Sequence, residues 1–185
     1  FPVPHNLLFL TLYAGQKDNP GELKMVEKTL TQMQKGGIFD HIGYGFSRYS
    51  TDQYYLAPHF EKMLYDNALL IMAYASVYVI TQNRLYLDTA EKTVQYVLRE
   101  MTSPNGGFYS AQDADSEGVE GKYYTFTLDE IIDILGRERG GQFSETFDIT
   151  AEGNFEGVNI PNLLKSNALD ADFGTEIPRL YDYRK

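Results

Sequence analysis

Residues 58–81 read PHFEKMLYDNALLIMAYASVYVIT and predict the central helix of the fold. Proline is favoured at the first position of a helix, so Pro58 predicts where this helix begins. After Asn67 the apolar residues lie nearly all round the helix, and a helix without a polar face belongs in the interior of a protein. The fold is therefore predicted to form around this segment, which runs to Thr81.

Amphipathic segments flank the central helix on both sides. Residues 20–35 carry apolar residues at helical spacing and end at Gly36-Gly37, which predicts an outer helix with one exposed face. Residues 84–101 show the same pattern and end before a Pro-Asn-Gly turn. Inner and outer helices therefore alternate along the chain, as in a toroid of αα-hairpins, and we expect this chain to supply only part of such a ring.

Each outer helix ends in a glycine pair, within GGIF (residues 36–39) and within GGFY (residues 106–109). Each pair leads into a long polar and aromatic loop. Because two antiparallel helices separate the loops, we expect both at the same end of the bundle, opposite the short link at residues 82–83. Long loops gathered on one rim often carry a functional site.

The second loop predicts a small β element. FYSAQDA (108–114) and GKYYTFT (121–127) alternate around Ser-Glu-Gly, which is typical of a β-hairpin. Thr127 and Glu130 then form a capping box that opens the short helix TLDEIIDILG. Beyond it, residues 153–162 are expected to form a loop and residues 176–183 a terminal helix.

Composition excludes several classes of function. The chain has 185 residues, 43% of them hydrophobic, which suffices for one globular core. Its 26 acidic and 16 basic residues give a net charge of −10, which repels nucleic acid. We see no apolar run typical of a membrane span and no secretory signal, so we expect no membrane contact and a cytoplasmic location by default. The absence of cysteine excludes disulfides, thiolate metal sites and cysteine nucleophiles.

His59 is the first catalytic candidate. It is predicted at the start of the buried helix, with Lys62 one turn on and Asp66 two turns on along the same face. In the functional interpretation, a carboxylate orients His59, which acts as a general acid or base on a bound sugar or polyol. In the structural interpretation, His59 and Glu61 bond to loop backbone and lock the mouth of the ring.

Asp40, His41 and Arg48 lie in the first loop, where glycines permit a turn back toward His59. Arg48 is predicted to clamp a carboxylate, either of a substrate or of the protein itself. Tyr49 is predicted either to stack on a sugar ring or to pack within the loop.

An acidic cluster marks the second loop: Asp113, Asp115, Glu117 and Glu120. Two of these carboxylates can serve as acid and base in glycoside hydrolysis if they lie about 5 to 10 Å apart. DADSEG also begins like a calcium loop, but Tyr124 stands where an EF-hand needs glutamate, so we reject that motif. The structural interpretation is a polar hairpin without a ligand. We predict no metal site and no cofactor.

Three strings resemble one known family: GGIFDHIGYGFSRYSTDQYYLAPHFEKMLYDNALL, GGFYSAQDADSEGVEGKYYTFT and GNFEGVNIPN. They are similar to segments of bacterial YyaL and of spermatogenesis-associated protein 20, and the resemblance covers nearly all of residues 1–185. In that family a thioredoxin-like domain precedes a six-hairpin (α/α) barrel similar to N-acylglucosamine 2-epimerases and six-hairpin glycosidases. The resemblance implies a mainly α fold, a partial (α/α)6 toroid with a small β-hairpin in a rim loop.

The resemblance also implies the domain organisation. Residues 1–185 are expected to form one partial toroid domain, without the upstream thioredoxin-like domain and the downstream hairpins. An incomplete ring would expose apolar surface between Leu69 and Val79, so we expect self-association.

The predicted function is that of a carbohydrate-related domain, with epimerase-like or glycosidase-like chemistry if it is an enzyme. The alternative is a non-catalytic module that docks the thioredoxin-like domain of the same parent chain. The predicted catalytic residues are His59, Asp40, His41, Asp113 and Asp115. The predicted ligand-binding residues are Arg48, Tyr49, Glu61, Lys62, Asp66 and Glu120. The epimerase form uses His59 or His41 as base, and the hydrolase form uses two of the three aspartates.

Overall fold

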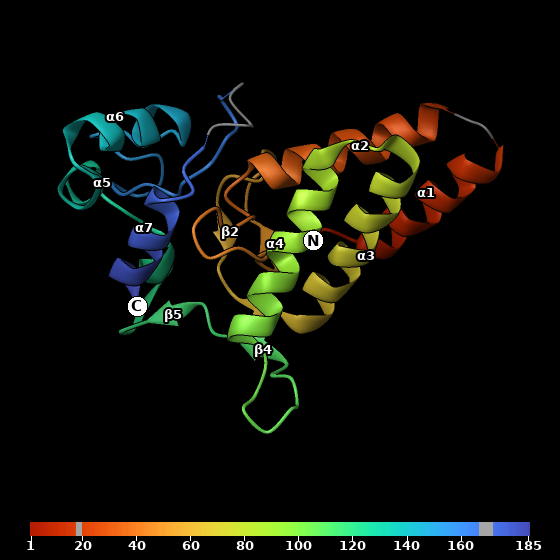
Figure 1. The fold of residues 1–185 in the computed structure, drawn as a ribbon, viewed down its shortest axis with the longest axis horizontal. Coiled ribbons are helices and arrows are strands. Elements are labelled where there is room, and N and C mark those ends of the chain that lie inside the picture. The colour runs from red at the N-terminus through yellow and green to blue at the C-terminus, as the bar shows by residue number, and fades with distance from the viewer. Residues whose placement is uncertain (18–19, 167–171) are drawn as a thin grey trace.

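The computed structural model describes residues 1–17, 20–166 and 172–185, and it is mainly helical (Figure 1). The helices are α1 (Pro4–Lys17), α2 (Pro20–Lys35), α3 (Leu64–Thr81), α4 (Arg84–Glu100), α5 (Leu128–Leu135), α6 (Arg137–Thr146) and α7 (Glu176–Arg184). The strands are β1 (Tyr49–Ser50), β2 (Pro58–His59), β3 (Lys62–Met63), β4 (Ala111–Gln112), β5 (Asp115–Ser116) and β6 (Val119–Glu120). These strands form three antiparallel pairs: β1 with β2, β3 with β4, and β5 with β6.

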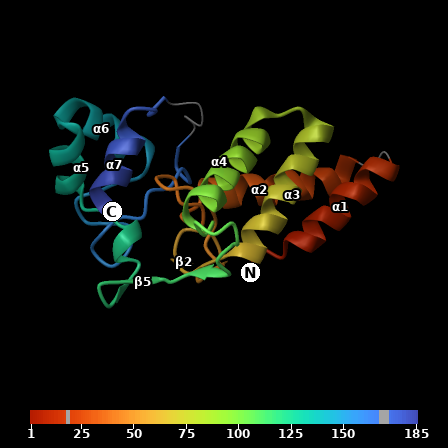
Figure 2. The ribbon, with the colours of Figure 1, turned by 60° about the horizontal axis from the view of Figure 1, so that its bottom comes forward.

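Helices α1 to α4 form the first lobe as two neighbouring helical hairpins. Figure 2 shows α3 between α1 and α4, and α3 packs against both. Leu30, Met33, Leu70 and Tyr74 are fully buried between the helices, where the Tyr74 hydroxyl donates to the Leu30 carbonyl oxygen at 2.7 Å. The predicted helices at 20–35 and 84–101 are confirmed. Helix α1 was not predicted, although Leu7, Thr11 and Ala14 are buried along one face of it.

The start of the central helix was predicted wrongly. Helix α3 begins at Leu64, and residues 58–63 are extended instead of helical. Burial alternates along this segment: Phe60 and Lys62 are buried, and His59, Glu61 and Met63 are half-exposed. Strand partners distant in sequence, β1 and β4, supply the hydrogen bonds that a helix would have supplied locally. His59, Lys62 and Asp66 therefore do not share one helical face.

Helix α3 alone among the helices of the described ranges is long and apolar enough to cross a membrane, a property that the sequence pattern did not suggest. The core helix of a soluble protein passes the same test of length and composition, so the indication is weak. Met72 and Val79 are exposed whereas Leu70, Tyr74 and Val77 are buried, so one side of this helix presents apolar side chains to solvent. Self-association through that surface stays a prediction.

Helices α5, α6 and α7 form a second lobe around Ile131, Phe143 and Leu180. The capping box of Thr127 and Glu130 and the terminal helix are confirmed. Helix α6 was not predicted, because its sequence contains a glycine pair that usually interrupts helices. Here Gly140 lies directly against α5, and a Cβ at this position would crowd Ile132. Close packing with α5 thus outweighs the low helix propensity.

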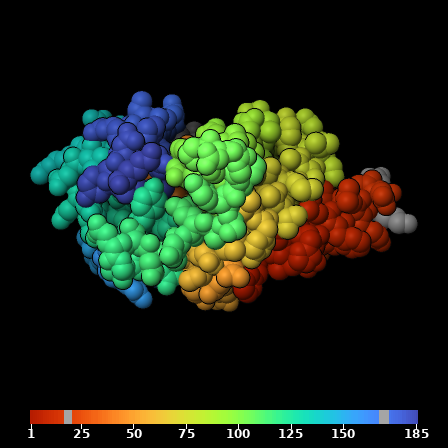
Figure 3. Space-filling view, turned by 90° about the horizontal axis from the view of Figure 1, so that it is seen from below, coloured from red at the N-terminus to blue at the C-terminus, as the bar shows by residue number. Residues whose placement is uncertain are grey.

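The two long loops meet at one end of the first lobe, as predicted. Lys62 pairs with Gln112 across β3 and β4, and the Arg99 guanidinium donates to the Gly43 carbonyl oxygen. Figure 3, seen from below, shows the second loop (green) beside the first (orange). The predicted hairpin is shorter than expected: only β5 and β6 form it, whereas β4 pairs with β3 and residues 122–124 form a 3-10 turn.

Candidate functional site

A buried charge cluster lies where the first loop meets α7. The Asp40 carboxylate accepts two hydrogen bonds from Arg184, of 3.1 and 2.6 Å, and one from Lys62 Nζ at 2.9 Å. The backbone N–H groups of Ile42 and Gly43 donate to the same carboxylate. All of these partners belong to the protein, so the structure gives Asp40 the role of joining the loop to α7.

Burial alone would raise the pKa of Asp40, but Arg184 and Lys62 outweigh it and hold that pKa well below its usual range. Burial lowers the pKa of Lys62 to about 8, although the Asp40 carboxylate opposes this shift. The Lys62 ammonium lies 4.4 Å from the Tyr96 ring centre and 4.8 Å from that of Tyr124. Aromatic faces thus help to hold this buried cation.

His41 lies in the interior, between the rings of Phe39 and Phe147. A ring nitrogen of His41 lies 3.3 Å from the Gly36 carbonyl oxygen. Burial lowers the pKa of His41 to about 4, and the nearby Lys92 cation lowers it further while Asp40 opposes. His41 is therefore neutral at pH 7 and packed within the loop.

His59 lies on the rim, where β2 faces solvent. Its Nδ1 atom lies 2.6 Å from Glu120 Oε1, its Nε2 atom lies 4.0 Å from Glu61 Oε2, and its side chain is 31% exposed. The Tyr49 ring stacks on His59 with ring centres 5.1 Å apart. Tyr49 thus orients the histidine, and Glu120 from β6 and Glu61 flank its two ring nitrogens.

Arg48 and Asp66 extend this rim. Arg48 Nη1 donates to Glu61 Oε2 at 2.8 Å. Of the two partners that the sequence allowed for Arg48, the structure shows a carboxylate of the protein itself. Asp66 is buried in the first turn of α3, and its Oδ2 atom has no hydrogen-bond partner among the described residues. Burial raises the pKa of Asp66, and the Arg48 cation offsets part of the rise. We call His59, Glu120, Glu61, Arg48 and Tyr49 the rim cluster.

The acidic residues of the second loop lie beside the rim cluster. Asp113 Oδ1 accepts from the Asp115 backbone N–H at 3.2 Å, and both side chains are exposed. They line a hollow of about 190 Å³ with Gln112 and Tyr123. Across the described ranges no group of three or more His, Cys, Asp and Glu residues is arranged to hold a metal ion.

Two site residues escaped the sequence analysis. Arg184 comes from the last helix, and nothing in the sequence relates it to Asp40. Asn67 is fully buried; its side chain accepts from the Phe46 N–H at 2.7 Å and donates to the carbonyl oxygens of Phe46 and Met63. The sequence did contain a signal for Asn67, because an amide in an otherwise apolar helix is expected to be buried and a buried amide needs hydrogen-bond partners.

The chain was compared with known proteins. No family model matches it. It is 43% identical to human (Homo sapiens) spermatogenesis-associated protein 20 over 145 residues, which are 73% of this chain and 18% of that protein. It is 42% identical to the protein of the same name from Rattus norvegicus over 151 residues, 76% of this chain and 19% of the relative. It is 35% identical to uncharacterized protein B0495.5 of Caenorhabditis elegans over 166 residues, 82% and 22% of the two chains. The chain thus spans about a fifth of the length of these relatives.

Proposed function

This chain belongs to the family of spermatogenesis-associated protein 20, and on that premise we propose that its rim cluster binds a carbohydrate-like ligand with His59 as acid–base group. The two neighbouring hairpins of α1 to α4 and the loops gathered at one end support the proposal that they form part of an (α/α)6 toroid. The family name states no activity, so the chemistry rests on the side chains of the rim.

The position of His59 between Glu120 and Glu61 carries this proposal. A carboxylate at one ring nitrogen fixes the tautomer and the orientation of the imidazole ring. With Nδ1 as donor to Glu120, Nε2 is free to accept a proton, and the side chain is exposed enough for a ligand to reach it. Glu61 and Arg48, paired with one another, offer acceptors and donors for ligand hydroxyl groups.

In the epimerase form, His59 Nε2 removes a proton from the carbon next to the carbonyl group of an open-chain sugar. The Glu120 carboxylate stabilises the imidazolium that results. His41, buried and neutral, does not take part in this form of the proposal.

In the hydrolase form, Asp113 and Asp115 act as acid and base, because both are exposed on the same rim. Asp40 is enclosed by Arg184 and Lys62 and has no proton to give, so this form does not use it. The replacement His59→Asn separates the two forms. It abolishes epimerisation and leaves hydrolysis by carboxylates largely intact, whereas Asp113→Asn has the opposite effect.

A docking module for a thioredoxin-like domain is the second candidate. The pairing of Asp40 with Lys62 and Arg184 within the protein favours it, because these buried charges hold the first loop in place without any ligand. A docking module binds the separate thioredoxin-like domain and no saccharide.

Calorimetric titration of the chain with monosaccharides, disaccharides and N-acylated sugars tests the leading proposal. We expect a saccharide to bind and its affinity to fall at least tenfold in His59→Gln, because the ring nitrogen is lost. The matched control is His5→Gln, an exposed histidine of α1, which should bind like the parent chain. Equal affinity of His59→Gln and the parent chain would remove His59 from the site, and no binding of any saccharide would favour the docking module.

A further inference from the structure

The rim cluster continues along one face of the extended segment 58–63. His59, Glu61 and Met63 are the half-exposed residues of this segment, and Phe60 and Lys62 between them are buried. Alternate residues of an extended chain share a face, so the first three side chains line the same outer side. His59 pairs with Tyr49 at one end of this face, and Met63 pairs with Ala111 at the other.

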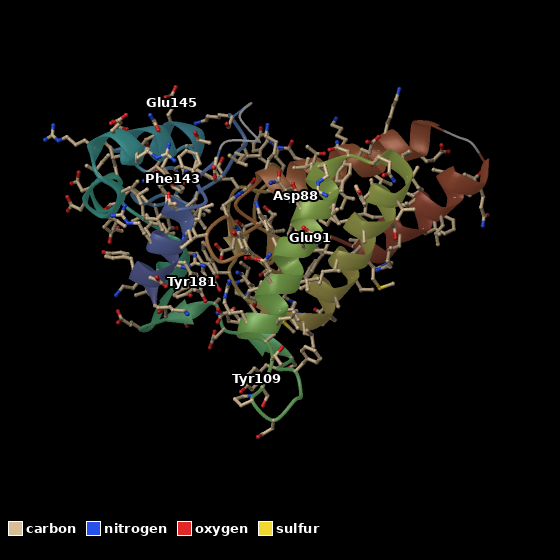
Figure 4. All side chains as sticks on the ribbon, viewed as in Figure 1. Asp88, Glu91, Tyr109, Phe143, Glu145 and Tyr181 are labelled. Carbon is tan, nitrogen blue, oxygen red and sulfur yellow. The ribbon has the colours of Figure 1, made fainter. Side chains whose placement is uncertain are left out.

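Each end of the face adjoins a segment that carries a tyrosine. Tyr49 is already stacked on His59, so at that end the histidine itself meets a ligand. At the other end, Tyr109 stands two residues before Ala111 and is 51% exposed. Figure 4 shows Tyr109 on the loop that projects from the β4 end of the molecule. Its loop is tied down, because the Tyr109 N–H donates to the Met101 carbonyl oxygen at 2.8 Å.

The length of the face limits what it can hold. Four residues of extended chain separate His59 from Met63, which corresponds to about 13 Å. This length exceeds that of a single sugar ring. The exposed tyrosine offers a flat apolar surface for a second ring, and Glu61 with Arg48 lies between the two ends to bind hydroxyl groups.

We propose that the face takes an oligosaccharide of at least two rings, with one ring at His59 and another on Tyr109. This inference rests on the proposed function and adds the length of the ligand to it. Tyr109 is a specificity-determining residue in this arrangement, because it contacts only a ligand long enough to reach it.

The test is calorimetric titration of the chain with two series of probes: N-acetylglucosamine, chitobiose and chitotriose, and glucose, maltose and maltotriose. In at least one series we expect the oligomers to bind more tightly than the monomer. In Tyr109→Ala the ratio of oligomer affinity to monomer affinity should fall by about three- to tenfold, which is the effect expected for the loss of one aromatic contact. The affinity for the monomer should be unchanged. Tyr109→Phe keeps the ring and should keep the gain.

Tyr54→Ala is the matched control, since Tyr54 is an exposed tyrosine of the first loop outside this face, and it should leave both affinities unchanged. Equal binding of monomer and oligomers, or an unchanged gain in Tyr109→Ala, would overturn the inference and leave the proposed function standing. Absence of binding by every probe would overturn the proposed function together with the inference.

Discussion

The Arg184 guanidinium donates two hydrogen bonds, of 3.1 and 2.6 Å, to the Asp40 carboxylate and thereby joins α7 to the first loop. A further hydrogen bond, from the Tyr181 hydroxyl to Glu100, ties α7 to the end of α4. Figure 4 shows Tyr181 on the side of α7 that faces the first lobe. These contacts join the first loop and α4 of the first lobe to α7 of the second lobe.

Replacing Arg184 with alanine should lower the free energy of unfolding by about 3 to 5 kcal/mol, because it leaves a buried carboxylate with one fewer cation. Urea denaturation followed by circular dichroism measures the change. The control is Arg137→Ala, an exposed arginine of α6, with an expected loss below about 1 kcal/mol. An equal loss of unfolding free energy in both variants would show that the ion pair of Arg184 with Asp40 does not stabilise the fold.

Acidification should weaken the fold through His41. The unfolded chain takes up this proton near pH 6.5, whereas burial lowers the folded pKa to about 4, so the contribution is complete above pH 6.5 and disappears toward pH 4. The loss amounts to about 3 kcal/mol across this range. Urea midpoints between pH 7 and pH 4 measure it. The variant His41→Gln should show a correspondingly smaller slope, and an unchanged slope would contradict the assignment.

Asn67→Ala should destabilise the chain by about 2 to 4 kcal/mol, because the N–H and carbonyl groups of Phe46 would lose their buried partner. Thermal denaturation of this variant and of Asn105→Ala, an exposed asparagine in the second loop, provides the comparison. Similar melting temperatures for both variants would mean that Asn67 does not hold the first loop.

Gly121 and Gly118 provide a matched pair for the hairpin that carries Glu120. Both have left-handed backbone, with φ of 76° and 77°, but a Cβ on Gly121 would overlap the Phe60 ring, whereas space around Gly118 is open. Gly118→Ala should therefore lose about 1 kcal/mol from backbone strain. Gly121→Ala should lose more and should displace Glu120 from His59, measurable as a change in the imidazole resonances. Equal losses of stability in the two variants would show that the close approach of Phe60 to Gly121 does not matter for the hairpin.

The sequence predicted those elements whose signals are local. The helices at residues 20–35 and 84–101 have apolar periodicity, and Thr127 with Glu130 caps a helix through contacts only three residues apart. Residues 58–63 escaped because their extended form depends on strands β1 and β4, which lie far away in sequence. Helix α6 was not predicted, because glycine disfavours a helix and the reason for Gly140, its close packing against α5, is visible only in the folded chain.

The candidate site shows the same division. Residue types alone singled out His59, Glu61, Glu120 and Asp40, because ionisable groups among aromatic residues need partners. Which of them pair is a property of the folded chain. The sequence offered no means to place Asp40 with Arg184 in the interior and His59 with Glu120 on the surface.

The central claim is that a saccharide binds at the rim next to His59. NMR spectra of the imidazole rings test this claim most directly. We would record the ring resonances of all three histidines while titrating the chain with chitobiose and then with maltose. The account predicts that one of the saccharides shifts the His59 resonances in a saturable way and leaves those of His5 and His41 in place. Unchanged His59 resonances at the highest concentration of both saccharides would contradict it.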